Sequence, residues 1–469
     1  MLKKKHPTLL TVSGVGILLI FSLFYSQMEV SLSGLEANRF AVVQAVGEQG
    51  VFHINQTQFR MVDKIIRNGK FYSDKPLTLG WSVGMLHKAI HTLTGLNFKD
   101  NYHFLIYFYN ILSGGLVNIL IFVWLFNHLR RYRSGSVEKK FLIALSAVLG
   151  SWLLSYSVTI NNHTPAALAF LGWFIALEKF HRIRLLSTAF IAGLSGGLVT
   201  SFDLPIGFFT CIITLFVLYF SSSKDWKSVF SGAAGAALAG FFIIGLNFYA
   251  YGTILPLYIA HGGGTYTPGT DMKNHFGYLF EALFGYRGFF IYQPFMIFSI
   301  FSLWHLRRKL SPAVLGAAAV SLISIVFYLY MTNEYGGAAY GFRYLIPLIP
   351  VLWYLAGIWL LEKKSKCLWG AAILFMLLGI IAALPGAYAP FCLAFEGHRS
   401  PEQHVTRKIR SSFMGNLLSW SYENDPDSFL TRKLRAHYGQ ETSRRYLFSS
   451  YLMLKKIEPM ARISQEKNY

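Results

Sequence analysis

The chain has 469 residues, of which 54% are hydrophobic, 17% are aromatic and only 14% are charged. Soluble domains carry about 25% charged residues, so this composition excludes an ordinary soluble protein. The net charge of +21 would suggest nucleic-acid binding in a soluble chain, but here most basic residues fall in short links between apolar runs. We therefore expect a membrane protein with no nucleic-acid partner.

Continuous apolar runs of about 18 or more residues recur along the chain, and each is long enough to cross about 30 Å of hydrocarbon as a helix. The first run has no clear small-x-small cleavage site, so we interpret it as an uncleaved helix rather than a signal peptide. The pattern predicts an all-α polytopic fold with about 11 transmembrane helices. They are expected near residues 8–27, 103–127, 141–159, 164–180, 186–202, 205–221, 229–250, 287–304, 311–331, 345–361 and 368–387.

The links between these runs predict the orientation. The basic links are residues 130–133, 179–184, 224–227, 307–309 and 363–366. Alternation from Lys3, Lys4 and Lys5 at the N-terminus puts all of these links on one side, which the positive-inside rule assigns to the cytoplasm. We expect a multi-pass protein of the cytoplasmic (plasma) membrane.

The segments on the other side are longer and more polar. Residues 28–102 form a large first outer loop, in which "RFAVVQAVGEQGVF" and "LTLGWSVGMLHKAIHTL" predict helices that lie in the membrane interface or dip back into it. Residues 388–469 form a small, basic outer tail after the membrane domain of residues 1–387. The cysteines Cys211, Cys367 and Cys392 form no framework, so we expect neither a disulfide nor a cysteine-based metal site.

Polar side chains recur in the outer loops and at the outer ends of the predicted spans. The candidate site residues are Glu36, Asn38, Arg39, Asp63, Asp74, Lys75, His163, Asp203, Tyr340 and Arg343. A polar group held against a membrane face is costly unless it is paired or used, whereas the inner links are only short and basic. We therefore expect the working surface to face outward.

Three of these residues have chemistry that suits group transfer. Glu36 could accept a proton from an incoming hydroxyl or amine, although the helix dipole also favours an acid at a helix start. Lys75, which Pro76 restricts to extended backbone, suits a phosphate as a point charge, and the guanidinium of Arg343 could grip a phosphate with two N–H groups. Both cations could instead anchor the chain in the interface.

His163 and Asp203 lie at tight outer turns. No His-x-x-His or Glu-x-x-His spacing accompanies His163, so a turn or polar contact is favoured over a metal ligand. Asp203 stands between two apolar runs with Pro205 after it, which fits a helix cap as well as a site residue.

Together these residues resemble the membrane-embedded glycosyltransferases of the GT-C superfamily. The branch they look most like contains the protein O-mannosyltransferases, the lipid A aminoarabinose transferase and the RgtA/B/C/D-like domain. Its members open with one span and an outer loop that begins Asp-Glu-x-Arg-Tyr, which Glu36-Ala37-Asn38-Arg39-Phe40 matches. A later Lys-Pro-Pro-Leu element is matched by Asp74-Lys75-Pro76-Leu77, and "YGGAAYGFRYLIPLIP" is similar to a late stretch of many bacterial members.

The resemblance covers roughly residues 1–390 and implies a GT-C-like fold that moves a sugar from a polyprenyl-phosphate-linked donor to a lipid, glycan or protein acceptor. It implies that Glu36 is the general base, that Lys75 and Arg343 hold the lipid phosphate, and that Asn38 and Arg39 orient the carboxylate or donor. The other candidates complete the expected substrate-binding set. We expect no fixed cofactor, with room for a divalent cation.

The chain departs from the family pattern in three places. Glu36 stands where the family usually has its catalytic Asp, and Ala37 replaces the second acid. The second outer loop carries Asn161-Asn162-His163 where members often have an Asp.

Two other functions fit a multi-pass protein. A transporter or flippase of envelope glycan precursors usually shows polar or broken helices near the midplane, often in matching halves, and we expect no such pair here. An O-antigen-type polymerase or ligase also has a large outer loop, but usually later in the chain than residues 28–102. No motif indicates the donor sugar or the acceptor.

Overall fold

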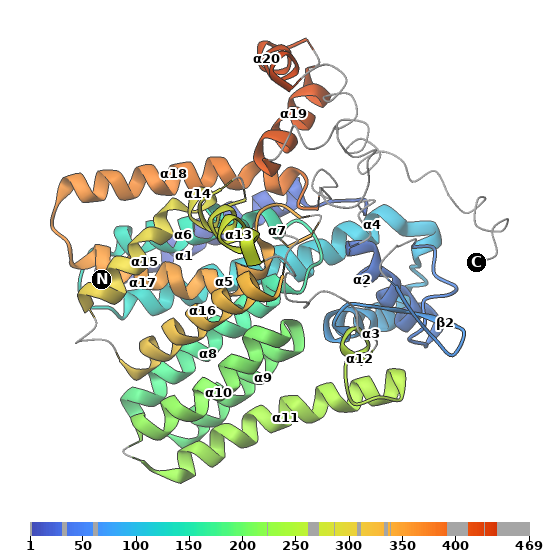
Figure 1. The fold of residues 1–469 in the computed structure, drawn as a ribbon, viewed down its shortest axis with the longest axis horizontal. Helices are drawn as coiled ribbons and strands as arrows, with labels where there is room; N and C mark the ends of the chain where they lie inside the picture. Colours follow the sequence, from blue (N-terminus) through green and yellow to red (C-terminus); the bar gives the residue numbers. More distant parts are fainter. Residues whose placement is uncertain are drawn as a thin grey trace.

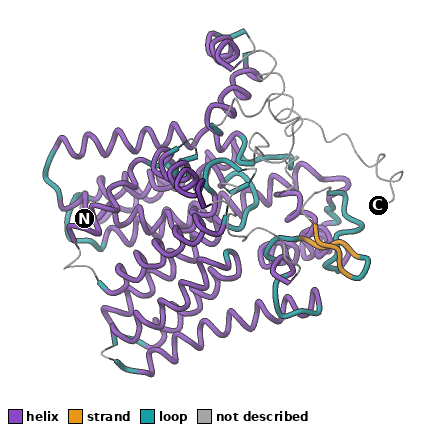
Figure 2. Tube along the Cα trace, viewed as in Figure 1, coloured by secondary structure: helices purple, strands orange, loops and turns teal. Residues whose placement is uncertain are grey.

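The computed structural model describes residues 2–30, 35–59, 64–222, 224–260, 272–285, 287–306, 311–332, 336–337, 339–391, 411–425 and 427–438. Within these ranges helices dominate, and the sheet is a hairpin of β1 (Lys64–Arg67) and β2 (Lys70–Ser73), drawn orange in Figure 2. Asn68 and Gly69 form its turn with φ values of 49° and 71°, the left-handed pair that two-residue hairpins favour. The expectation of an all-α fold is confirmed.

A large group of helices lies side by side as a bundle (Figure 1). They are α1 (Leu2–Tyr25), α5 (Leu116–Arg130), α6 (Val137–Leu149), α8 (His163–Ile183), α9 (Leu186–Phe202), α10 (Leu204–Ser221), α11 (Trp226–Tyr251), α15 (Ile297–Leu306), α16 (Pro312–Met331), α17 (Ile349–Glu362) and α18 (Lys366–Tyr388). Helix α17 is buried from Ile349 to Leu361 and contacts α5, α6, α8 and α15. By contrast, α11 exposes large apolar side chains such as Phe241 and Phe248. Helix α17 therefore forms the interior, and α11 presents an apolar outer face.

Seven helical segments in the described residues are long and apolar enough to cross a membrane. They are Pro7–Tyr25, Phe98–Arg130, Leu204–Ser221, Trp226–Tyr251, Pro312–Met331, Arg343–Glu362 and Lys366–Tyr388. The apolar helices Leu186–Phe202 and Pro294–His305 are shorter, and α8 takes the place of the predicted span 164–180. The protein is thus a multi-pass integral membrane protein, although these lengths do not confirm the predicted number of spans.

The predicted span 141–159 is wrong as a single helix. Helix α6 ends at Leu149, and a separate short helix, α7 (Trp152–Tyr156), follows it. Gly150 leaves helical geometry at φ −101° and ψ 26°, and the Ser151 side chain caps α7 by accepting a hydrogen bond from the Leu153 amide. A hydroxyl that caps a new helix favours a break over continuation.

The predicted span 287–304 is also interrupted. The short helix α14 (Phe289–Tyr292) ends before Gln293, and the 3-10 turn η4 (Pro294–Met296) leads into α15. Pro294 has no amide hydrogen for a continuing helix. The rings of Trp152 and Phe289 lie 5.6 Å apart, so the two breaks are neighbours. Two of the predicted spans are therefore broken helices.

The first outer loop folds into a group of helices at the right-hand end of the bundle in Figure 1. It contains α2 (Leu35–Gln44), the π-helix η1 (Ala45–Gln49), α3 (Leu77–Thr94) and α4 (Phe98–Asn110), which continues through η2 (Ile111–Gly115) into α5. Helix α3 buries one face and exposes Met85 and Leu93 on the other, as an interfacial helix would. All residues of α2 are buried, so this helix packs against protein on all sides.

Glu48 in η1 joins the helices of this group. Its carboxylate accepts hydrogen bonds from the Phe98 amide at 2.6 Å and from Nε2 of Gln44 at 2.9 Å, and it lies 3.1 Å from Nε2 of His87. Burial of the carboxyl raises its pKa, but these contacts outweigh burial and hold the pKa of Glu48 below its ordinary value. The ionised carboxylate therefore fastens η1 to α3 and α4.

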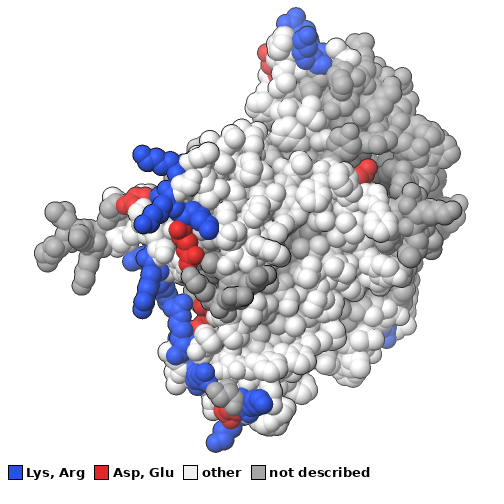
Figure 3. All heavy atoms as spheres, turned by 60° about the vertical axis from the view of Figure 1, so that its left-hand side comes forward, with Lys and Arg blue, Asp and Glu red and all other residues white. Residues whose placement is uncertain are grey.

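The described basic links gather along one end of the bundle (Figure 3), and the link of residues 307–309 lies outside the described residues. Their exposed members include Arg130, Arg131, Arg182, Lys227 and Lys364. Two links meet there, because the Tyr132 hydroxyl donates to Oε1 of Glu362 at 2.6 Å. Helix α8 has 21 residues, about 31 Å at 1.5 Å per residue, so His163 at its start lies far from this basic end.

The remaining described elements flank the opposite end. They are α12 (Leu257–Ala260), α13 (Met272–Phe284), η5 (Arg343–Leu348), α19 (Ser412–Asn424) and α20 (Phe429–Tyr438). Asn416 of α19 donates from Nδ2 to the carbonyl oxygens of Pro385 and Ala389, each at 2.8 Å. The described part of the predicted tail is thus docked on the end of α18.

Candidate active site

Three predicted site residues lie on the first turns of α2. Glu36 stands in the first turn and is 1% exposed, a position that suits a helix-start acid as well as a carboxylate held in a site. Asn38 donates from Nδ2 to Oδ1 of Asp74 at 2.8 Å, and Arg39 donates from Nε to Oδ1 of Asn162 at 2.7 Å. Helix α2 therefore ties two loops that are distant in sequence to one surface.

Asp74 and Lys75 form the turn between β2 and α3. The Lys75 amide donates to Oγ of Ser73 at 3.1 Å, and Pro76 begins the helix at φ −50° and ψ 129°. Nζ of Lys75 lies 2.7 Å from Oδ2 of Asp74, and the two side chains are 17% and 25% exposed. The ammonium is thus held in place yet still accessible, as a phosphate-binding lysine must be.

A second carboxylate pairs with a histidine. His163 begins α8, and its Nδ1 lies 3.2 Å from Oδ2 of Asp203. Oδ1 of Asp203 accepts hydrogen bonds from the Tyr328 hydroxyl at 2.6 Å and from the Ile206 amide at 3.4 Å. The second contact caps α10, so the predicted cap role of Asp203 is confirmed. The same carboxylate orients one edge of the imidazole.

Aromatic rings bring Arg343 into this group. Arg343 begins η5, is 8% exposed, and has its guanidinium carbon 5.4 Å from the ring centroid of Tyr344. Tyr344 stacks on Tyr328 with centroids 4.9 Å apart and lies 5.9 Å from the His163 ring. Arg343 and the His163–Asp203 pair therefore share one aromatic wall.

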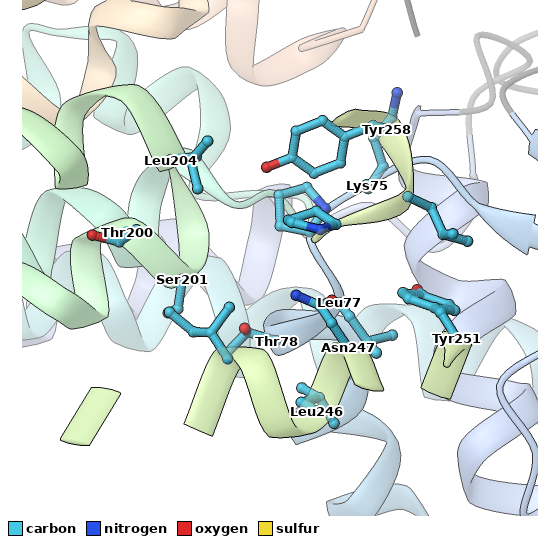
Figure 4. Close-up of a pocket in the computed structure, with 14 residues that line it drawn as sticks. Lys75, Leu77, Thr78, Thr200, Ser201, Leu204, Leu246, Asn247, Tyr251 and Tyr258 are labelled. Atoms are coloured by element: carbon cyan, nitrogen blue, oxygen red, sulfur yellow. The ribbon is translucent and has the colours of Figure 1, made fainter. Parts of the chain in front are cut away.

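A pocket of about 380 Å³, its open mouth included, lies beside this group (Figure 4). Figure 4 shows Lys75 and Tyr258 on one side of it, with Thr200 and Ser201 of α9 on the other. Its apolar lining comes from Leu77, Leu204, Ile243, Leu246 and Leu257. Apolar walls beside one cation and several hydroxyl groups suit an amphiphile with an anionic head.

Charges act across this group. Burial lowers the pKa of His163 below its ordinary value, and the positive charges of Arg343 and Arg39 lower it further, against the opposing effect of Asp203. Burial also raises the pKa of Tyr258, and the negative charge of Asp203 adds to this rise. These effects place Asp203 within electrostatic reach of the pocket wall, and they keep the imidazole neutral at neutral pH.

The structure brings most of the predicted residues to one end of the bundle. Asn38 meets Asp74 and Lys75, and Arg39 reaches the loop that carries His163. Asp63 lies outside the described residues. Tyr340 is fully buried: its hydroxyl donates to the Ala382 carbonyl of α18, and its ring meets the Tyr292 ring edge-on with centroids 5.2 Å apart.

The sequence did not single out Tyr328 and Tyr258, and it indicated Asn162 only as part of the polar second outer loop. Asn162 is 2% exposed, and its Nδ2 has no hydrogen-bond partner among the described residues, as expected where a ligand oxygen completes the contact. Tyr328 lies near the end of an apolar helix, where tyrosine is common, so nothing in the sequence distinguished it from an interfacial residue.

The acids and histidines of the group do not form a metal centre in the described part of the chain. No cluster of three or more His, Cys, Asp or Glu side chains able to hold a cation occurs there. Cys211 and Cys367 are free thiols. We therefore derive no step through the divalent cation for which the sequence left room.

Comparisons with known proteins were informative only at the level of structure. No protein-family model and no curated protein sequence matches the chain. The crystal structure of apo ArnT from Cupriavidus metallidurans matches with a TM-score of 0.55 and 14% identity, over 94% of this chain and 75% of that one. The same protein bound to undecaprenyl phosphate matches with a TM-score of 0.53 and 15% identity, over 94% and 76%.

A more distant match is the oligosaccharyltransferase AglB from Archaeoglobus fulgidus, in complex with an inhibitory peptide and a dolichol-phosphate. It has a TM-score of 0.45 and 14% identity, over 98% of this chain and 61% of that one. The ArnT matches cover nearly the whole chain. The chain therefore shares the fold of ArnT from Cupriavidus metallidurans.

Proposed function

We propose that the protein is a membrane glycosyltransferase that moves a sugar from a polyprenyl-phosphate-linked donor to an acceptor at the outer face. One observation carries the proposal: Lys75 lines a partly apolar pocket with Leu204, and the residue before Leu204, Asp203, holds His163 in a group whose aromatic wall also carries Arg343. An amphiphilic donor needs such a pairing, because its isoprenoid stays in lipid while its phosphate needs cations. ArnT, which shares the fold, binds undecaprenyl phosphate in its own structure.

Lys75 and Arg343 would hold the phosphate and stabilise the charge that develops on it. Lys75 is a point charge on a turn that Pro76 holds in shape, and Arg343 is a buried planar donor against Tyr344. Asn38 acts on Lys75 through Asp74. These contacts support a preorganised phosphate site, since the cations are held by neighbours rather than by the ligand alone.

Glu36 would act as the general base that takes a proton from the acceptor nucleophile. It lies one helical turn before Arg39, which reaches the second outer loop through Asn162. The carboxylate thus sits on the same helix as the residues that organise the two loops. A glycan, lipid or protein acceptor would approach from the water side.

We also propose that the site faces outward from the plasma membrane. The basic links gather at the end of the bundle away from His163 (Figure 3), and basic links favour the cytoplasmic side. On this reading residues 1–387 form the membrane domain, and α19 belongs to an outer tail that rests on α18.

The broken helices do not favour a transporter. Their breaks meet through the rings of Trp152, Phe289 and Tyr292, and all three residues are buried. A transport site needs polar groups and space where helices break. Aromatic rings fill most of this place, and the polar groups there are the buried amide of Gln293 and Nε1 of Trp152, which have no hydrogen-bond partner among the described residues.

Comparative mass analysis of the cell tests the proposal. Polyprenyl-linked sugars and envelope glycans are measured with and without the protein, and with an inactive Lys75→Ala/Arg343→Ala variant. Loss of one glycan modification, with accumulation of one polyprenyl-linked sugar, is the expected result. Unchanged lipid-linked sugars and unchanged glycans in both cases would contradict it.

A further inference from the structure

His163 is the residue on which the charges of the site converge. Charged or titratable groups face it from four elements: Asp203 between α9 and α10, Tyr328 on α16, Arg343 and Tyr344 on η5, and Arg39 on α2. Its neighbour Asn162 is the direct partner of Arg39. Any anion that binds Arg343 therefore also changes the field at the imidazole.

Asp203 contacts only one of the two ring nitrogens of His163. Oδ2 of Asp203 faces Nδ1 of His163, while Oδ1 is engaged by Tyr328 and by the Ile206 amide. Nε2 of His163 has no hydrogen-bond partner among the described residues. The carboxylate thus orients the ring, is itself held by two donors, and would stabilise a positive charge on the imidazole.

Without a ligand, the two arginines and burial disfavour that positive charge. A phosphate beside Arg343 would neutralise much of the arginine field while leaving Asp203 in place. The balance at His163 then moves towards the protonated form, because the phosphate adds a negative charge near that of Asp203 and reduces the field of Arg343.

We propose that His163 takes up a proton when the lipid phosphate binds beside Arg343, and that its Nε2–H then serves the leaving phosphate as a general acid. This role rests on the proposed function and adds a second proton-transfer group to it. It also explains the chain-specific residue in the second outer loop, where an imidazole held by a distant aspartate stands in place of an acid.

The reaction balances with this group included. The acceptor O–H gives its proton to Glu36, and the acceptor oxygen forms a bond to C1 of the sugar. The bond between C1 and the phosphate oxygen breaks, and its electron pair stays on that oxygen, which receives the proton from Nε2 of His163. Glu36 later releases its proton to water. This release balances the proton that His163 took up from water when the lipid phosphate bound.

Calorimetric titration of the detergent-solubilised full chain with undecaprenyl phosphate tests the proposal without any sugar donor. Binding heats are measured at pH 7.5 in two buffers of different ionisation enthalpy, which yields the number of protons exchanged per ligand bound. The free ligand titrates in the same way for every variant, so a difference between variants arises in the complex. Wild type should take up more protons than His163→Gln, by up to one proton per ligand bound.

Matched variants separate this role from a structural one. Asp203→Asn keeps a helix-capping side chain but removes the charge that stabilises the imidazolium, so proton uptake should fall towards that of His163→Gln. His305→Gln, in α15 at the other end of the bundle, should behave as wild type. As pH rises, the affinity of wild type for undecaprenyl phosphate should fall more steeply than that of His163→Gln. The extra loss is up to about tenfold per pH unit, which is the limit for one coupled proton.

The outcomes distinguish the two proposals. Equal proton uptake in wild type, His163→Gln and Asp203→Asn, with undecaprenyl phosphate still bound, overturns the role of His163 and leaves the glycosyltransferase standing. Absence of binding to the folded wild-type protein overturns both. Reduced uptake in both site variants, with thermal unfolding close to wild type, supports the assignment.

Discussion

Replacing Lys75 with alanine should weaken the binding of a lipid phosphate strongly while leaving the fold intact. The ammonium is 17% exposed and lies 2.7 Å from Asp74, so it is neither deeply buried nor fully hydrated. A hydrogen bond to a charged group in such a setting contributes about 1.5–3 kcal/mol, which corresponds to roughly 10- to 150-fold in affinity. Truncation also leaves the Asp74 carboxylate facing the ligand without its cation, so the larger value is expected.

The double variant Asp74→Asn/Lys75→Ala separates these two effects. It removes the stranded carboxylate and still offers an amide oxygen to Asn38 Nδ2, so binding should recover to about tenfold below wild type. Lys75→Arg keeps the charge and should lose less than Lys75→Ala. Lys64→Ala is the matched control, because Lys64 is an exposed lysine of the same loop whose Nζ lies 4.2 Å over the Phe71 ring.

Affinity for undecaprenyl phosphate is measured by titration of each purified variant in detergent, with thermal unfolding as the check on folding. Turnover with the donor identified by mass analysis gives an independent second readout. If Lys75→Ala binds the lipid phosphate as tightly as Lys64→Ala does, Lys75 is an interface anchor and the proposed phosphate site is wrong.

Three further predictions follow from the same structure. Glu36→Gln should reduce transfer by at least about a hundredfold with little change in unfolding temperature, and an active variant would remove Glu36 as the base. In a cysteine-free background, Lys70→Cys should react with a membrane-impermeant thiol reagent in intact cells while Arg133→Cys is protected, and the reverse pattern would invert the topology. Glu48→Gln should lower stability at pH 7 by about 1–2 kcal/mol. The pKa of the Glu48 carboxyl is depressed in the folded state. The stability difference between wild type and Glu48→Gln is therefore present above the ordinary pKa of 4.5 and should vanish as pH falls through the folded-state pKa. An unfolding-temperature difference that is equal at pH 7 and pH 4 would contradict this.

The local motifs of the outer loop correctly predicted where two candidate residues lie in the local structure. Lys75 lies where the Lys-Pro element placed it, at the start of α3, and Glu36 lies in the first turn of a helix as its position implied. The sequence could not indicate that α2 is buried on all sides, because its short apolar stretch is equally compatible with lipid and with protein as its surroundings.

The chain by itself determined that this is a helical multi-pass membrane protein, because hydrocarbon demands long apolar segments and those are visible in any sequence. It also determined which links gather at one end, because basic residues mark one side of the membrane. Only the tertiary structure decided that His163 pairs with Asp203, 40 residues away, and that Tyr328 fixes the same carboxylate. Such pairs depend on how helices pack against one another, and each partner alone fits a cap or an interfacial residue equally well. The breaks at Gly150 and Gln293 were hidden for the same reason, since apolar composition predicts that a segment is buried but not that it is one unbroken helix.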